Sequence, residues 1–122
     1  MNETILHITT REAWNNAQRQ GRYSAPSLMN EGFIHCSTRK QVLPVADKFY
    51  KGQAGLILLV INLARLSSDL KWEPPFEGAP PAGVAAKDTF PHIYGPINLD
   101  AVVRVIDFVT APDGRFVLPS LI

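Results

Sequence analysis

The feature that most constrains the fold is one apolar run, LILLVINL at residues 56–63, in which Asn62 is the single polar residue. Eight residues are too few for a membrane span, and a run of this length favours a strand over a helix. An apolar run without alternation is typical of a strand that is buried on both faces. We therefore expect this strand to be covered on both sides.

The composition limits the size of the protein and its partners. The chain has 122 residues, 46% of them hydrophobic, which predicts a single domain over residues 1–122. A net charge of +1, from 12 basic and 11 acidic residues, gives no basic surface for duplex nucleic acid. No signal peptide and no apolar run of about 18 residues are found, so no membrane partner is expected. A single cysteine allows no internal disulfide, which fits a cytoplasmic protein, and we expect a monomer or a weak homodimer.

The first third of the chain predicts a strand and a helix. Residues 5–8 (ILHI) form the strand, and Thr9 with Glu12 is a capping box for a helix over residues 11–20. Gly21 follows as the residue of positive φ that ends the helix.

The next segment predicts a loop, a strand and a second helix. Residues 22–31 are expected to be a loop, and residues 33–36 a strand. Thr38 with Gln41 is a second capping box. Pro44 predicts either a kink or a helix that starts later. The helix carries one apolar stripe: Val42, Val45, Ala46 and Phe49.

Strands dominate the rest of the chain. We expect a short strand at 70–73, an irregular and mobile segment at 74–88 and a long strand at 101–110, followed by a turn at 112–114 and a return strand at 115–118. In the long strand, Arg104 is expected to be exposed, with Val103 and Val105 on the other face. With two helices early and strands late, the predicted class is α+β with a mostly antiparallel or mixed sheet.

Three histidines lie in or beside predicted strands, and their neighbours decide between kinds of site. His35 and Cys36 are adjacent, so strand alternation points them to opposite faces, and they cannot readily share a metal. We expect no metal site, and a buried, unreactive Cys36. In FPHIYGP at residues 90–96, alternation places His92 and Tyr94 on one face. We expect His35 and His92 to converge on one cleft, with His7 at its rim.

Two further positions keep alternatives open. Ser37 and Thr38 either cap the next helix or, with the amides of its first turn, hold an anionic group of a ligand. Glu73, at the end of a predicted strand, either is solvated or lines the cleft.

A resemblance extends over nearly the whole chain. It is carried by LHITT, GFIHCST, FY, LILLVINLARL, LKWE and FPHIYGPINLDAVVRV, at residues 6–10, 32–38, 49–50, 56–66, 70–73 and 90–105. With this order and spacing, the chain resembles the small bacterial family called Domain of Unknown Function 952.

That family is in turn similar to the ADP-ribosyltransferase fold, which implies a split β-sheet that grips NAD. The resemblance implies that His7 holds a ribose hydroxyl, with Thr9 beside it, and that Phe33 stacks on nicotinamide. Ser37 and Thr38 are implied to bind the same molecule. The remaining positions that follow the outline are Gly32, His35, Ala46, Tyr50 and the segment YGPINLDAVVRV.

The chain departs from the superfamily pattern at two positions. Phe90 stands four residues before Tyr94, where the superfamily has the glutamate that stabilises charge on the ribose. Ile8 stands where many relatives have glycine. Some members, such as the RNA 2′-phosphotransferases, use histidines and arginines in place of that glutamate. The catalytic candidates are therefore His35, His92 and Tyr94, with His92 as the base.

Two functions follow as expectations. In the first, the protein is an ADP-ribosyltransferase-type enzyme that transfers or cleaves NAD or an ADP-ribose-containing molecule; NAD is then a substrate, and no tightly bound cofactor is expected. In the second, the same cleft is a non-catalytic module that binds a nucleotide or small metabolite. A third interpretation, an interaction protein, rests on the PPFEGAPPAG segment. Fold resemblance alone does not decide among them.

Overall fold

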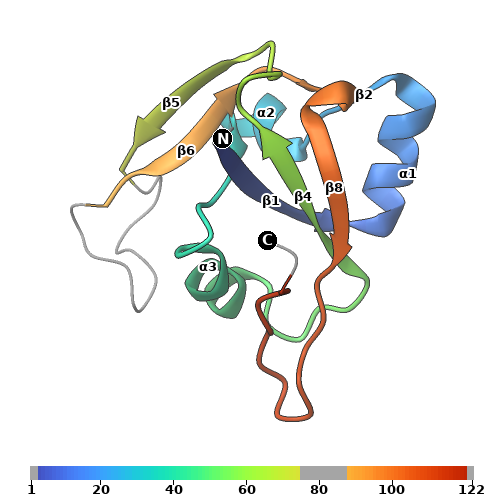
Figure 1. Ribbon diagram of the computed structural model, residues 1–122, viewed down its shortest axis with the longest axis vertical. Helices are drawn as coiled ribbons and strands as arrows, with labels where there is room; N and C mark the ends of the chain where they lie inside the picture. Colours follow the sequence, from blue (N-terminus) through green and yellow to red (C-terminus); the bar gives the residue numbers. More distant parts are fainter. Residues whose placement is uncertain (1–2, 75–87, 121–122) are drawn as a thin grey trace.

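The computed structural model in Figure 1 describes residues 3–74 and 88–120, and it confirms the α+β class. All pairings between its strands are antiparallel. In chain order the elements are β1 (Thr4–Thr10), α1 (Arg11–Gln20), β2 (Arg22–Tyr23), α2 (Pro26–Glu31), β3 (Ile34–His35), α3 (Val42–Phe49), β4 (Leu56–Asn62), β5 (Asp69–Glu73), β6 (Phe90–Tyr94), β7 (Ile97–Asn98), the 3-10 helix η1 (Leu99–Ala101) and β8 (Val102–Asp107). No helix in the described ranges is long and apolar enough to cross a membrane.

The apolar run at residues 56–63 is the central strand, as predicted. β4 lies between β1 and β8, and every residue of β4 is buried. Its side chains alternate between two apolar clusters, so each face of the sheet has its own core. One core contains Ile57, Leu59 and Ile61 with Trp14 and Ala17 of α1; the other contains Leu58 and Val60 with Val42 and Ala46 of α3.

A second three-stranded sheet stands beside the first. Its strand order is β3-β6-β5, and a short pair, β2-β7, completes the pairing. The two larger sheets are joined where the backbones of Leu6 and Ser37 exchange two hydrogen bonds of 2.8 Å. Figure 1 shows β5 and β6 splayed away from β1, β4 and β8 on one side of the molecule, with α1 on the opposite side.

The faces of the β3-β6-β5 sheet differ in chemistry, and strand alternation is the reason. Ile34, Cys36 and Ile93 point into the core, which confirms the prediction that Cys36 is buried. Residues one position along each strand, such as His35 and His92, point to the other face. That outer face carries the polar and aromatic side chains described below.

The early part of the chain needs two corrections. The cap of α1 is Thr10, whose hydroxyl accepts from the Ala13 amide at 3.0 Å, and not Thr9 as predicted. The strand continues through Thr9, so its side chain points inward. Residues 22–31 are not a loop but contain β2 and α2. The short α2 begins at Pro26, and Gly32, with φ of 92°, ends it. In the sequence taken by itself, a proline and a glycine at this spacing indicate a turn.

The third helix begins later than its cap signal indicates. α3 starts at Val42, so Pro44 lies in the first turn, where a missing amide costs nothing. Of the predicted capping box, the half made by Gln41 is present, because its side chain accepts from the Thr38 amide at 3.1 Å, but the residue at the cap position of the helix is Gln41 and not Thr38. Val42 and Ala46 of the predicted apolar stripe are buried. Phe49 is 56% exposed, so the prediction that it belongs to this stripe is wrong.

The C-terminal strand is shorter than predicted. A register shift opposite Val60 and Ile61 leaves Val103 unpaired, so Val103 and Arg104 are both exposed. The turn at 112–114 is confirmed, while residues 115–118 form only an isolated bridge between Thr110 and Phe116. The irregular segment predicted at 74–88 lies, apart from its two end residues, outside the described residues.

Candidate functional site

The outer face of the β3-β6-β5 sheet brings His35 and His92 together. The two residues are direct partners in the antiparallel register, and their ring centroids are 5.5 Å apart. Phe33 stacks on His92 at 4.1 Å and lies 5.4 Å from the ring of Tyr94. The predicted convergence of these two histidines is therefore present, and Tyr94 lies on the same face.

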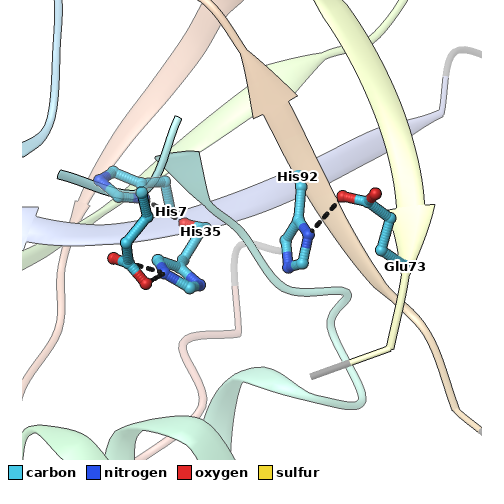
Figure 2. Close-up of polar contacts among 5 residues, drawn as sticks. His7, His35, Glu73 and His92 are labelled. Carbon is cyan, nitrogen blue, oxygen red and sulfur yellow. Dashed lines mark hydrogen bonds and ion pairs between the residues drawn. The ribbon is translucent and has the colours of Figure 1, made fainter. Parts of the chain in front are cut away.

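Glu73 joins His92 and Tyr94 into one hydrogen-bonded unit, which we call the β6 cluster. One carboxylate oxygen, Oε1, accepts from His92 Nδ1 at 2.9 Å (Figure 2) and also from the Tyr94 hydroxyl at 2.5 Å. Glu73 is the register partner of Phe90, so it is a diagonal neighbour of His92 across the strand pair. The cluster is thus assembled across two strands that are adjacent in the sheet.

These contacts fix the protonation of the β6 cluster. A carboxylate only accepts, so Nδ1 of His92 carries the proton, and in a neutral ring Nε2 then holds a lone pair. Figure 2 shows this second nitrogen directed away from Glu73, and within the described residues no hydrogen bond reaches it. Burial lowers the pKa of His92, an effect that the hydrogen bond to Glu73 opposes. An imidazole held in this way has the geometry that a general base requires.

The neighbours of His92 are held in complementary states. The hydrogen bonds from Tyr94 and His92 lower the pKa of Glu73, and the positive charge of Lys71 acts in the same direction. The bond to Glu73 raises the pKa of Tyr94. Lys71 also places its Nζ 4.7 Å from the centre of the Tyr94 ring. Near neutral pH the cluster therefore holds an ionised carboxylate and a protonated phenol.

His35 belongs to a second histidine–glutamate pair. Its Nε2 lies 3.1 Å from both carboxylate oxygens of Glu31, the last residue of α2. The His35 side chain is 46% exposed, whereas that of His92 is 3% exposed. One pair is therefore at the surface and the other lies largely beneath it.

His7 and Thr9 do not join this face; they form an interior group with Tyr23, which we call the β1 network. His7 Nδ1 donates to the backbone carbonyl of His35 at 2.6 Å, and the Tyr23 hydroxyl donates to Nε2 at 2.7 Å. The hydroxyls of Tyr23 and Thr9 are hydrogen-bonded at 2.9 Å. Burial lowers the pKa of His7 to about 4 and raises that of Tyr23 to about 12. Both ring nitrogens of His7 thus serve the fold, and its role in binding a ligand stays a prediction.

Ser37 and Thr38 are also occupied by the fold. Ser37 is buried and its backbone pairs with Leu6, while the Thr38 amide bonds to Gln41. Because α3 begins four residues after Thr38, neither amide belongs to the first turn of a helix. The amides of Ser37 and Thr38 are therefore taken by the fold, and the role of these two residues in binding an anionic group stays a prediction.

Two partners were not singled out by the sequence, Glu31 beside His35 and Tyr23 in the β1 network, and the role of Glu73 in the β6 cluster was left open. The signal for Glu73 was its place at a strand end, which left its role open. For the other two no signal existed, because their segment reads as a loop. Among residues 3–74 and 88–120, no three His, Cys, Asp or Glu side chains are placed to hold a metal ion.

The fold and the polar face define a small antiparallel α+β domain, and comparisons identify its family. The family described as "Protein of unknown function (DUF952)" matches residues 8–105, so the chain belongs to this family. Its fold is similar to the crystal structure of protein CC0527 from Caulobacter crescentus, with 34% identity, 95% of each chain covered and a TM-score of 0.79. The solution NMR structure of CC0527 is similar at 35% identity, covering 92% of this chain and 90% of that one, with a TM-score of 0.71. No curated protein matches.

Proposed function

We propose that the β6 cluster is the active centre of an enzyme that binds NAD or another ADP-ribose-containing molecule and transfers or cleaves it. The observation that carries the proposal is the single Glu73 oxygen that accepts from both His92 Nδ1 and the Tyr94 hydroxyl. An imidazole fixed in this tautomer presents Nε2 as a base, which is the task that a transfer to water or to a hydroxyl acceptor requires.

The proposed step uses the residues as follows. His92 Nε2 takes the proton from water or from an acceptor hydroxyl, whose oxygen forms a bond to the anomeric carbon of the ribose. The bond from that carbon to the leaving group breaks, and the electron pair departs with the leaving group. Glu73 stabilises the imidazolium that forms, because its carboxylate already accepts from Nδ1.

The resemblance to the ADP-ribosyltransferase fold supports the choice of substrate class. The pairing of β5 with β6 also supplies a carboxylate near the position where the superfamily glutamate is missing. The superfamily glutamate is replaced by Phe90, but Glu73 is the direct cross-strand partner of Phe90. A carboxylate is therefore present beside the expected position, supplied by β5 instead of β6. Phe33 lies on the same face, where its buried ring is stacked on His92, so its implied stacking on nicotinamide stays a prediction.

The test is turnover by purified protein and by His92→Ala. Nicotinamide released from NAD and free ADP-ribose are measured by chromatography, and the affinity for ADP-ribose is measured by calorimetry. His92→Ala is expected to lower turnover by about a hundredfold or more while affinity changes by only a few-fold. Glu12→Gln, an exposed change on α1, is the control and is expected to behave as wild type. Turnover that survives the loss of His92 would remove this residue from the mechanism.

A second candidate is a binding module without turnover. It is favoured by one observation, the 3% exposure of the His92 side chain, which leaves little of the ring for contact with a reacting group. In that case wild-type protein consumes neither NAD nor an ADP-ribose-linked compound with any acceptor, yet ADP-ribose raises its melting temperature. His92→Ala then weakens binding alone.

A further inference from the structure

Two histidine–glutamate pairs face each other across β3 and β6, and a single general base does not account for the second pair. His35 is the register partner of His92, and their rings meet edge to face at 5.5 Å. Each ring is bonded to its own carboxylate, His92 to Glu73 and His35 to Glu31. The two carboxylates come from different elements, the end of β5 and the end of α2.

The two pairs differ in the exposure of the ring and in the ring nitrogen that contacts the carboxylate, and these differences suit a base and an acid. Glu73 accepts a hydrogen bond from Nδ1 of a largely buried ring. Burial favours the neutral imidazole, which has a lone pair on Nε2. Glu31 stands against Nε2 of a half-exposed ring, and because a carboxylate only accepts, this nitrogen carries a proton. The positive charge of His35 also lowers the pKa of His92, so one charged ring favours a neutral neighbour.

We propose that His35 is the general acid of this site, positioned by Glu31, and that the substrate is an ADP-ribosyl compound joined through oxygen at its anomeric carbon. This deepens the proposed function and rests on it. The chemistry of the leaving group is the reason: nicotinamide leaves NAD as a neutral base and needs no proton, whereas an O-linked group leaves as an alkoxide and does.

The step balances with the two rings alone. Water gives a proton to His92 Nε2, and its oxygen forms the new bond to the anomeric carbon. The bond from that carbon to the leaving oxygen breaks, and the leaving oxygen takes the proton from Nδ1 of the protonated His35 ring, while the Nε2 proton stays hydrogen-bonded to Glu31. One proton has then entered at His92 and one has left from His35, and exchange with solvent restores both.

The site also predicts that Glu31 matters only through His35. Glu31 reaches no other ring of the outer face through a hydrogen bond that the described residues record, so its removal leaves the β6 cluster intact. Glu31→Gln is therefore expected to reproduce the His35 defect in weaker form.

The experiment compares leaving groups. Wild type, His35→Asn, Glu31→Gln and the control Glu12→Gln are assayed on a serine O-ADP-riboside and on a 4-nitrophenyl O-ADP-riboside, with NAD as third substrate. His35→Asn is expected to lower kcat/KM about a hundredfold on the serine compound and less than about threefold on the nitrophenyl compound. Glu31→Gln follows the same pattern with about a tenfold loss. Melting temperatures establish that each variant folds, and Glu31→Gln carries the test if His35→Asn does not fold.

The outcomes distinguish a failure of the proposed role of His35 from a failure of the proposed function. An equal loss on both leaving groups, or an O-linked compound that wild type does not process while NAD turnover still depends on His92, overturns the role of His35 and leaves the proposed function standing. If neither NAD nor any O-linked compound is consumed, both proposals fail.

Discussion

The β1 network and the β6 cluster contain the same residue types and do opposite things. Each has a buried histidine bonded to a second strand, and each includes a tyrosine hydroxyl. In the β1 network both nitrogens of His7 are taken by uncharged groups of the protein, one of them a backbone carbonyl. In the β6 cluster a carboxylate holds one nitrogen of His92 and leaves the other directed away from it. Both histidines are buried, so the partners of the two ring nitrogens, more than burial, distinguish a structural histidine from one that can act as a base.

The largest effect should follow from removing the interior histidine. His7→Ala leaves the His35 carbonyl and the Tyr23 hydroxyl without their partner and opens a cavity between β1, β2 and β3. The free energy of unfolding, measured by urea denaturation, is expected to fall by about 4 kcal/mol. His35→Ala is the matched control, because its exposed ion pair is expected to contribute less than about 1 kcal/mol. Similar losses in both variants would contradict the assignment of His7 to the fold.

Lowering the pH should destabilise the fold through the β1 network, because His7 is buried in its neutral form. The pKa of His7 is about 4 in the fold and 6.5 ordinarily, so below pH 6.5 the unfolded chain binds a proton that the folded chain does not. Stability is therefore unaffected above that pH and is lost as pH falls toward 4, by about 3 kcal/mol in total. Carboxylates add their own dependence, so the measurement is the difference between wild type and His7→Gln, which cannot titrate. A difference that stays constant from pH 7 to about 4 would contradict the prediction.

Changing the orienting carboxylate should affect activity more than stability. Glu73→Gln is expected to lower turnover about tenfold or more, because the amide no longer stabilises the charged imidazole. Since Glu73 raises the pKa of His92, the acid limb of the pH–rate profile should move to lower pH in this variant. Asp69→Asn, on the same face of β5, is the control and should leave the profile in place. A limb that moves to higher pH would exclude this role of Glu73.

The smallest effect concerns the buried cysteine, Cys36. Cys36 is buried in the core, and burial raises the pKa of its thiol. Cys36→Ser is expected to cost about 1 kcal/mol of stability through a buried hydroxyl and to leave ligand binding unchanged. Native protein should react slowly with a bulky thiol reagent. Rapid labelling, or loss of binding in the variant, would show that Cys36 belongs to the site.

Alternation and local signals were enough to predict the frame of the fold. The unbroken apolar run predicted the central strand, and Gly21 predicted the end of α1. The same alternation placed His92 and Tyr94 together and sent Cys36 inward. These features depend on neighbours in the chain, which a single sequence contains.

What the sequence could not predict depends on contacts between distant segments. Glu73 meets His92 because β5 pairs with β6 in one particular register, and a shift by one residue would point it away. The resemblance assigned His7 to ligand binding, and its hydrogen bond to Tyr23 could not be predicted because Tyr23 lies in a segment that reads as a loop. Thr9 and Thr10 both fit an N-cap, and only the length of β1 decides between them.

The most direct measurement is the NMR of the imidazole nitrogens, with long-range correlations from ring protons to nitrogen in labelled protein near pH 7. We expect a neutral His92 with its proton on Nδ1 and an unprotonated Nε2, whose resonance moves when ADP-ribose is added. His7, with its proton on Nδ1 as well, should keep its nitrogen shifts at every ADP-ribose concentration. A His92 that does not respond to saturating ADP-ribose, or a His7 that responds in its place, would contradict the division between the β1 network and the β6 cluster.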